Sequence, residues 1–163
     1  MKNVLTYLVL ITLLSGCAWA NRYRGAATDD YGTVEFVNAS PAYRVNITLF
    51  EDATDCRGTK FISVFESTAG KSVTVDHREK LAISLGVSVQ ADLSVFSGCG
   101  GIYALPFSSG DRRITLAYFP EVGECRFLFE SNERGNWQVI NGVEEREPRQ
   151  PFLQSGAFCS LES

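Results

Sequence analysis

Cysteine is the residue type whose chemistry this sequence indicates most directly. The chain contains five cysteines, of which four follow the first 20 residues: Cys56, Cys99, Cys125 and Cys159. In an exported chain an even number of cysteines predicts two disulfides, for which three pairings are possible. Binding of a metal ion by thiolates is the alternative, but it typically uses close pairs such as Cys-x-x-Cys, and the sequence has none. We therefore expect structural disulfides and no metal site.

The strands on either side of residues 108–111 are expected to form a hairpin. The segments 101–107 and 113–119 flank Ser108-Ser109-Gly110-Asp111, which is a turn-forming sequence. A second turn then leads into a further strand over 124–131. The sequence therefore predicts a three-stranded meander in this part of the chain.

This meander favours one disulfide pairing, because its first and third strands begin at the same end of the sheet. Cys99 and Cys125 stand at these two starts, so we favour a Cys99–Cys125 bridge. The remaining pair is then Cys56–Cys159. It closes a loop of about 100 residues, which corresponds to a stabilisation of up to about 4.7 kcal/mol in the chain-entropy model.

The sequence contains no common hydrolase motif of the types Gly-x-Ser-x-Gly, Ser-x-x-Lys or His-Glu-x-x-His. The single histidine, His77, follows Asp76, and a nearby serine would complete a catalytic triad. However, residues 75–80 form a polar run between two predicted strands, which is typical of a solvated turn. Nothing places a pair of carboxylates in a cleft, as glycoside hydrolysis requires. We expect no catalytic residue, no enzymatic activity and no cofactor.

Three further polar segments are interpreted as connections between strands. The loop at 51–55, Glu51-Asp52-Ala53-Thr54-Asp55, offers oxygen ligands for calcium but lacks the alternating aspartates of a calcium loop, so an Asp-rich turn is expected. The glycines at 98, 100 and 101 are expected in a turn or bulge, since no helix follows to complete a phosphate site. The charge run at 144–150 is expected to be a solvated connection.

The N-terminus has the pattern of a secretory signal. One positive charge precedes an apolar run over 4–14, which is too short for the roughly 20 residues of a transmembrane helix. The next residues, Leu14-Ser15-Gly16-Cys17, resemble the bacterial lipobox. The resemblance implies that Cys17 receives a diacylglyceryl thioether, becomes the mature N-terminus and is then N-acylated. Cleavage near Ala18-Trp19-Ala20 by an ordinary signal peptidase is the alternative, and it would discard Cys17.

Residue 18 is alanine and not the aspartate that retains enteric lipoproteins in the inner membrane, so the resemblance implies the outer membrane. The expected organisation is a signal peptide at 1–16, a lipidated N-terminus and tether at 17–30, and a single domain at 31–163. The 163 residues are 45% hydrophobic with a net charge of -4. This composition excludes a disordered chain, and the acidic balance argues against binding of nucleic acid.

Alternation of apolar and polar residues with a period of two dominates the domain. Nine short strands are expected, separated by turn clusters that include 52–58 and 97–101; the strands are 33–38, 43–49, 60–66, 72–75, 81–90, 101–107, 113–119, 124–131 and 136–140. No stretch of ten residues has a helical period with caps. We predict an all-β fold, an antiparallel sandwich or alternatively a small barrel, with two disulfides.

Several short segments of the domain are similar to small exported β-sandwich domains of the transthyretin-like or PEGA-like kind. They include Val34-Glu35-Phe36-Val37-Asn38, Asp55-Cys56-Arg57-Gly58 and Cys125-Arg126-Phe127, within residues 33–131. The resemblance implies a sandwich fold and an adhesive or scaffolding role. It implies no active site.

Three functions of different classes are compatible with these features. The favoured hypothesis is a lipid-anchored outer-membrane protein with a structural or protein-binding role, whose partners are the membrane and another envelope protein. The alternative is a small-ligand binder or inhibitor similar to the periplasmic lysozyme-inhibitor lipoproteins. Their Ser-Gly-x-x-x-Tyr loop is absent, which disfavours this alternative. A hydrolase is the least favoured, because a nucleophile and a base are missing.

Overall fold

The structure, a computed structural model, describes residues 22–40, 43–65, 70–91, 95–150 and 156–160. This part of the chain contains eleven strands and no helix: β1 (Tyr31–Asn38), β2 (Arg44–Asp52), β3 (Arg57–Phe65), β4 (Lys71–Asp76), β5 (Arg78–Ala91), β6 (Val95–Phe107), β7 (Arg112–Phe119), β8 (Glu124–Glu133), β9 (Asn136–Val139), β10 (Glu144–Pro148) and β11 (Cys159–Ser160). The nine strands expected from alternation are all present. The predicted all-β class is confirmed.

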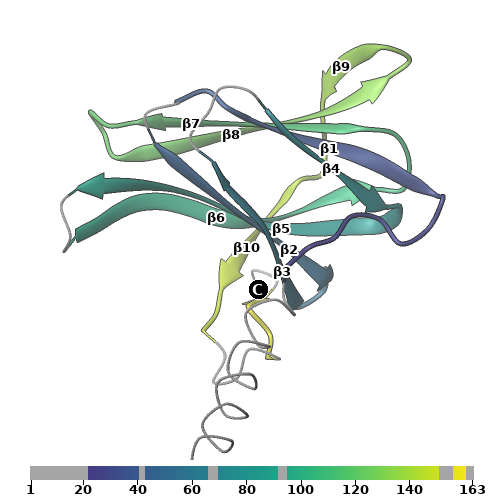
Figure 1. Cartoon of the computed structure of the whole chain (residues 1–163), viewed down its shortest axis with the longest axis horizontal. Coiled ribbons are helices and arrows are strands. Elements are labelled where there is room, and N and C mark those ends of the chain that lie inside the picture. Colours follow the sequence, from purple (N-terminus) through teal and green to yellow (C-terminus); the bar gives the residue numbers. More distant parts are fainter. Residues whose placement is uncertain (1–21, 41–42, 66–69, 92–94, 151–155, 161–163) are drawn as a thin grey trace, which may run out of the picture.

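The strands form two sheets that face each other (Figure 1). The five-stranded sheet has the order β4-β1-β7-β8-β9, and the six-stranded sheet has the order β11-β10-β6-β5-β2-β3. Every pairing within them is antiparallel except that of β1 with β7, which is parallel. The architecture is therefore a two-layer sandwich with one parallel pair.

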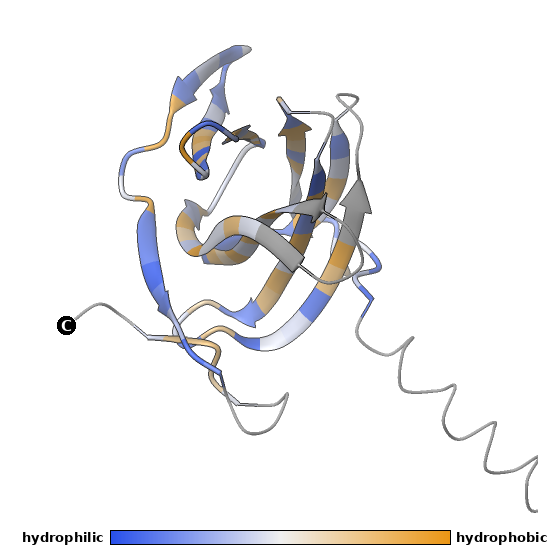
Figure 2. Ribbon diagram, turned by 90° about the vertical axis from the view of Figure 1, so that its left-hand side faces the viewer, coloured by the Kyte–Doolittle hydropathy of each residue, from blue (hydrophilic) through white to orange (hydrophobic). Residues whose placement is uncertain are grey.

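The core lies between the two sheets and follows the period of two seen in the sequence (Figure 2). On β5 the side chains of Leu81, Ile83 and Leu85 are at most 1% exposed. Phe36 of β1 and Phe107 of β6 are the largest of the fully buried side chains. Alternation places each of these side chains inward because successive residues of a strand point to opposite faces.

The predicted hairpin of 101–107 with 113–119 is wrong. β6 belongs to the six-stranded sheet, whereas β7 lies in the five-stranded sheet between β1 and β8. The turn at 108–111 carries the chain from one sheet to the other. Alternation shows that both strands have a buried face, but it does not show which sheet contains each face. The second half of the predicted meander, β7 with β8, is confirmed.

A buried arginine stabilises this crossing between the sheets. Arg112 is 7% exposed, and its guanidinium lies 5.4 Å from the centre of the Phe107 ring. Its Nε and Nη2 donate to the carbonyl oxygen of Pro106, and Nη1 donates to that of Asp111. Burial lowers the pKa of Arg112. Hydrogen bonds at all three nitrogens compensate for placing this charged group between the sheets.

Both expected disulfides are present, although one was derived from an incorrect topology. Cys99 on β6 is bonded to Cys125 on β8, so this bridge joins the two sheets and does not lie within one. Cys56, in the turn between β2 and β3, is bonded to Cys159 on β11. The second bridge spans 103 residues and attaches the C-terminal segment to the domain.

The turn expected at 97–101 is wrong, because these residues belong to β6 and pair with β5. A Cβ atom at Gly98 or Gly100 would lie 2.4 or 2.3 Å from the carbonyl oxygen of Val87 or Leu85. Glycine is therefore present here because β5 and β6 approach each other too closely for a side chain.

The charge run at 144–150 is also not the expected solvated connection. Residues Glu144–Pro148 form β10, which pairs with β6 and with β11. On the outer face of the six-stranded sheet a second buried group of side chains lies beside this strand. We call this group the outer cluster, and it consists of Phe50, Cys56, Ala82, Ile102 and Cys159.

We predict that removal of either bridge destabilises the fold, and that the longer loop matters more. The chain-entropy model gives a loss of up to about 4.7 kcal/mol for a loop near 100 residues and about 3.5 kcal/mol for one near 26 residues. Urea unfolding of Cys56→Ser/Cys159→Ser and of Cys99→Ser/Cys125→Ser measures both losses. A larger loss of unfolding free energy in Cys99→Ser/Cys125→Ser than in Cys56→Ser/Cys159→Ser would contradict this order. In the single variant Cys99→Ser, alkylation is expected at Cys125 alone.

Candidate functional site

The segment that follows the predicted lipidation site is bound to the domain. Residues 22–28, which we call the strap, contact one edge strand of each sheet. The sequence predicts a tether over 17–30, since this stretch has no periodicity. Within the described residues, the strap differs from a free tether because its backbone and side chains make specific hydrogen bonds.

At its first end the strap extends the six-stranded sheet. Arg22 forms an isolated parallel bridge with Phe61 of β3, and the amide of Tyr23 donates to the carbonyl oxygen of Phe61 at 2.8 Å. β3 is the edge strand of that sheet. Unpaired edges expose backbone donors and acceptors, and the strap covers part of this edge.

At its other end the strap binds β4, the edge strand of the five-stranded sheet. The Tyr23 hydroxyl donates to the carbonyl oxygen of Thr74 at 2.8 Å, and the amide of Ala26 donates to Thr74 Oγ1 at 3.2 Å. Gly25 between them has φ of 100°, and a Cβ there would lie 3.2 Å from Thr74 Oγ1. The strap therefore joins the open edges of both sheets on one side of the sandwich.

The carboxylate of Asp76 fixes the end of the strap. Its Oδ1 accepts hydrogen bonds from the amides of Ala27 and Thr28 at 3.0 and 2.8 Å, and from the Thr28 hydroxyl at 2.7 Å. These bonds, the hydroxyl first, lower the pKa of Asp76 below the ordinary 3.8, and the positive charge of Arg78 adds to this effect. Asp76 is thus a binding group for the strap, and its ionised form is the one that binds.

Tyr23 is the apolar anchor of the strap. Its ring packs against the main core from the edge, where it is partly buried. Burial raises the pKa of its hydroxyl, and the negative charge of Asp76 raises it further. The hydroxyl therefore remains a hydrogen-bond donor at neutral pH.

His77 lies beside the strap and is not in a solvated turn. Its side chain is 15% exposed, and Nδ1 lies 2.7 Å from Asp30 Oδ1. The ring packs on Phe107 at 5.5 Å between centroids. Asp76 accepts hydrogen bonds from the strap and no bond from His77 among those described. The two neighbours therefore form no catalytic pair, and His77 has a structural contact.

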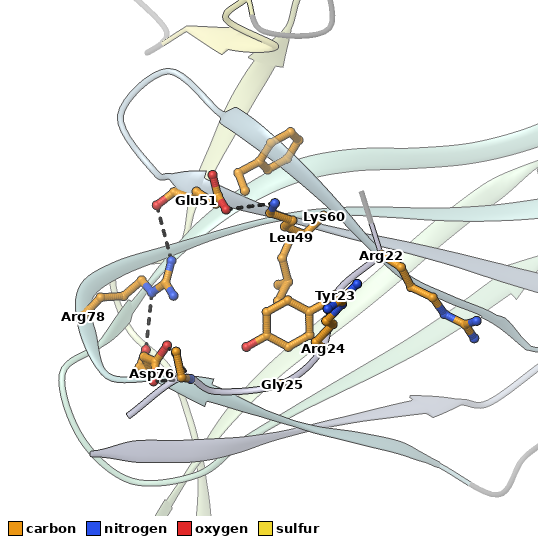
Figure 3. Close-up of a pocket in the computed structure, with 11 residues that line it drawn as sticks. Arg22, Tyr23, Arg24, Gly25, Leu49, Glu51, Lys60, Asp76 and Arg78 are labelled. Atoms are coloured by element: carbon orange, nitrogen blue, oxygen red, sulfur yellow. Dashed lines mark hydrogen bonds and ion pairs between the residues drawn. The ribbon is translucent and has the colours of Figure 1, made fainter. Parts of the chain in front are cut away.

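A cavity of about 300 Å³ lies where the strap crosses the sandwich (Figure 3). Lys60 and Glu51 form an ion pair of 3.1 Å in its wall, and Arg78 donates to the carbonyl oxygens of Glu51 and Asp76. Arg22 points away from the other labelled side chains in Figure 3 and is exposed. The strap therefore carries two exposed arginines, Arg22 and Arg24.

Other sequence-predicted residues are placed as follows. Cys17 lies outside the described residues. Asp52 Oδ1 accepts from the amide of Thr54 at 2.7 Å, which is the expected Asp-rich turn. In the described part of the chain no three His, Cys, Asp or Glu side chains are grouped to hold a metal ion. No helix among these residues is long and apolar enough to cross a membrane.

The outer face of the five-stranded sheet carries a second candidate surface, which sequence analysis did not identify. Leu128 on β8 and Val139 on β9 are 43% and 63% exposed. Trp137 lies on the same face, with the Arg113 guanidinium 4.1 Å from its ring centre. We call Leu128, Trp137 and Val139 the exposed patch. Alternation indicates which face these residues share, but it does not show that this face lacks a covering layer.

Comparison with known proteins gives no assignment. No protein family model matches the chain, and neither a curated protein nor a solved structure is similar to it.

We predict that Asp76→Asn releases the strap without unfolding the sandwich. The amide side chain has no negative charge and one fewer acceptor, so the amides of Ala27 and Thr28 lose protection. Hydrogen exchange at these amides should quicken several-fold, while exchange in β5 stays unchanged. Asp29→Asn alters an exposed carboxylate outside the strap and serves as the matched control. Equal exchange in both variants would contradict the assignment.

The same bonds imply a pH dependence. The pKa of Asp76 is lowered in the folded chain. The contribution of Asp76 to strap binding is therefore complete at pH values above the ordinary carboxyl pKa. The contribution is lost as the pH falls through the folded pKa, below 3.8. In the wild-type chain the amide signals of Ala27 and Thr28 should therefore titrate in this acid range.

Proposed function

We propose that this protein is a lipid-anchored lipoprotein of the outer membrane with a non-catalytic, protein-binding role. The observation that carries the proposal is the state of the cysteines. The four downstream cysteines are bonded to one another in two disulfides, which supports an oxidising compartment and leaves Cys17 as the odd cysteine of the chain. Cys17 is also the cysteine that follows Leu14-Ser15-Gly16.

The strap would fix how the anchored domain is oriented relative to the bilayer. Five peptide units separate Cys17 from Arg22, and they can span at most about 18 Å. Because the strap is bound to both sheets, the lipid would hold the strap end of the domain toward the bilayer. The exposed Arg22 and Arg24 would then lie near lipid phosphates. Several acyl chains at about 0.8 kcal/mol per buried CH₂ give stable attachment.

The exposed patch supports a protein partner in the envelope. It contains two exposed aliphatic residues beside a tryptophan, and aromatic residues are enriched in protein interfaces. It also adjoins β9, an edge strand of four residues that pairs with β8. A partner could therefore contact the patch and add a strand to this edge.

Cys17→Ala should release the folded protein in soluble form, since the strap and the disulfides lie beyond the anchor. Fractionation of membranes and intact mass measurement test this prediction. The wild-type mature chain is expected to begin at acylated Cys17, whereas ordinary cleavage would give an N-terminus at Asn21. Ala18→Asp is the matched control, because it keeps the lipid and should move the protein to the inner membrane. A Cys17→Ala protein that remains in the membrane fraction after residues 1–16 have been removed would exclude this anchor.

For the partner, we expect that a photo-crosslinking residue at Leu128 or Val139 captures a discrete envelope protein in living cells. The same residue at Arg149, which is exposed beside β10, is the control position. Val139→Lys should abolish the crosslink from Leu128 and leave the stability within about 0.5 kcal/mol, as for other surface substitutions. Equal crosslinking from all three positions would remove the support for this surface.

A further inference from the structure

Arg146 is a buried charged side chain with incomplete hydrogen bonding. It stands on β10 opposite Ile102 of β6, and the residue is 3% exposed. Nη2 donates to Glu144 Oε2 at 2.7 Å, but Nε and Nη1 have no hydrogen-bond partner in the described part of the chain. A buried donor without a partner costs about 1–3 kcal/mol. An acceptor from outside the chain would remove this cost.

The second buried arginine shows that this fold can satisfy a guanidinium with its own groups. In Arg112 all three nitrogens donate to backbone carbonyl oxygens. Both arginines are at most 7% exposed. The difference between them therefore does not arise from burial, and it distinguishes Arg146 as a group with spare donors.

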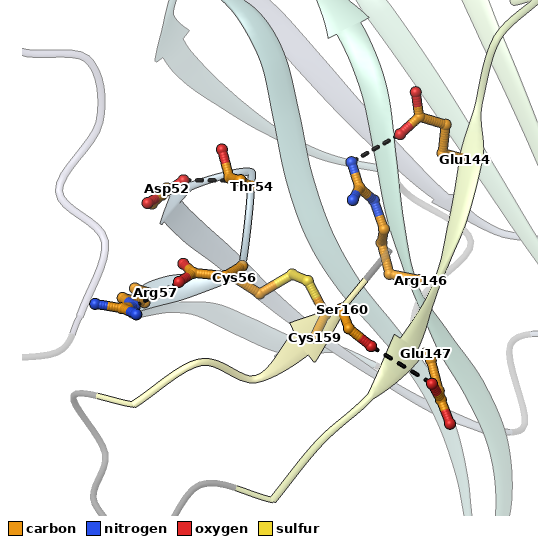
Figure 4. The surroundings of a disulfide bond; sticks show 10 residues. Asp52, Thr54, Cys56, Arg57, Glu144, Arg146, Glu147, Cys159 and Ser160 are labelled. Atoms are coloured by element: carbon orange, nitrogen blue, oxygen red, sulfur yellow. Dashed lines mark hydrogen bonds and ion pairs between the residues drawn. A yellow bond between two sulfur atoms is a disulfide. The ribbon is translucent and has the colours of Figure 1, made fainter. Parts of the chain in front are cut away.

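A cavity of about 510 Å³ adjoins Arg146. Its wall consists of residues 51–54 at the end of β2 and in the turn that follows, residues 78–80 at the start of β5, and Arg146 itself. Figure 4 shows the Arg146 side chain between the Asp52–Thr54 turn and Glu144. This volume lies within the range of about 300–1,000 Å³ that is usual for small-molecule sites. The spare donors thus belong to a side chain that lines a space of ligand size. The two nitrogens are themselves covered, so a ligand reaches them only when the guanidinium turns toward this space.

The wall of this cavity carries both signs of charge. Its cations are Arg78, Lys80 and Arg146, and its acids are Glu51, Asp52 and Glu79. Glu144 accepts from both Lys80 and Arg146, so one carboxylate is shared by two cations. Among the acids, Glu51 pairs with Lys60, whereas Glu79 is exposed. A ligand with a carboxylate and an amino group would complement both parts of the wall.

We propose that this cavity binds the free carboxylate of an amino acid or short peptide. The guanidinium of Arg146 turns toward the cavity on binding, and the carboxylate accepts hydrogen bonds from it, with Lys80 and Arg78 as further positive charges. The amino group of the ligand faces the acidic side of the wall, near Glu79 and Asp52. This site is independent of the anchor at Cys17 and goes beyond the proposed function.

Titration of the full chain with alanyl-alanine tests the site. The chain is labelled with ¹⁵N-arginine and kept in detergent micelles, and the Nε–H signal of Arg146 is assigned by its loss in Arg146→Lys. Alanyl-alanine should shift this signal. Alanyl-alanine amide lacks the carboxylate and should bind at least about tenfold more weakly, because a charge-assisted hydrogen bond is lost. N-acetyl-alanyl-alanine lacks the amino charge and should bind several-fold more weakly.

Three variants separate binding from folding. Arg146→Lys should abolish binding, and Arg149→Lys on the exposed chain after β10 is the matched control, which should bind normally. Thr54→Trp places a large ring in the cavity wall at an exposed position and leaves Arg146 unchanged. It should also abolish binding. If Arg146→Lys does not fold, Thr54→Trp and the three ligands still decide the question.

Other outcomes would overturn the proposal. Equal binding of the amide would exclude a carboxylate site. Inorganic phosphate that binds as tightly as the dipeptide would identify a general oxyanion site and exclude a peptide ligand. No shift with any probe would mean that water alone satisfies Arg146. None of these results affects the Cys17→Ala assay, so failure of this site and failure of the anchor are distinguishable.

Discussion

Burying a polar side chain is costly unless its hydrogen bonds are made, and two of the connections between the sheets show how this fold meets that constraint. Where the chain crosses between sheets, Arg112 lies inside the sandwich because carbonyl oxygens of Pro106 and Asp111 accept from it. At the β1–β2 connection, which also crosses between the sheets, Asn38 is 1% exposed and donates to the carbonyl oxygen of Tyr43, while its own oxygen accepts from the amide of Ser40. Each of these two connections thus contains a buried polar side chain whose hydrogen bonds are made within the fold.

The period of two predicts individual strands well but does not determine how they pair. Residues 101–107 and 113–119 both alternate, and a turn sequence between them suggested a hairpin, yet β1 takes the place beside β7 in the five-stranded sheet. The pairing of Cys99 with Cys125 followed from that incorrect hairpin and is nevertheless present, because both cysteines lie where β6 and β8 face each other across the core. The glycines at 98, 100 and 101 led to the incorrect prediction of a turn for a related reason. Close approach of two strands needs glycine as much as a turn does.

The candidate sites were harder to predict than the fold because they depend on contacts between distant segments. The strap has no apolar periodicity, and its binding groups, Thr74 and Asp76, are some 50 residues further along the chain. Arg146 lay in a charge run that suggested exposure. One feature of the sequence bears on the position of Arg146. It is two residues from Glu144 and two from Pro148, and alternate residues of a strand share a face. Charged residues are almost never fully buried unless they are paired, so the sequence alone predicted an exposed Arg146.

The cavity at the strap and the Arg146 cavity share two lining residues, Glu51 and Arg78. Arg78 lines both cavities, and it donates to the carbonyl oxygens of Glu51 in one wall and Asp76 at the end of the strap. Its charge also contributes to the low pKa of Asp76. Arg78 therefore acts in two places. Its hydrogen bond to Glu51 holds the end of β2 to the start of β5, and its charge favours the ionised form of Asp76 that binds the strap.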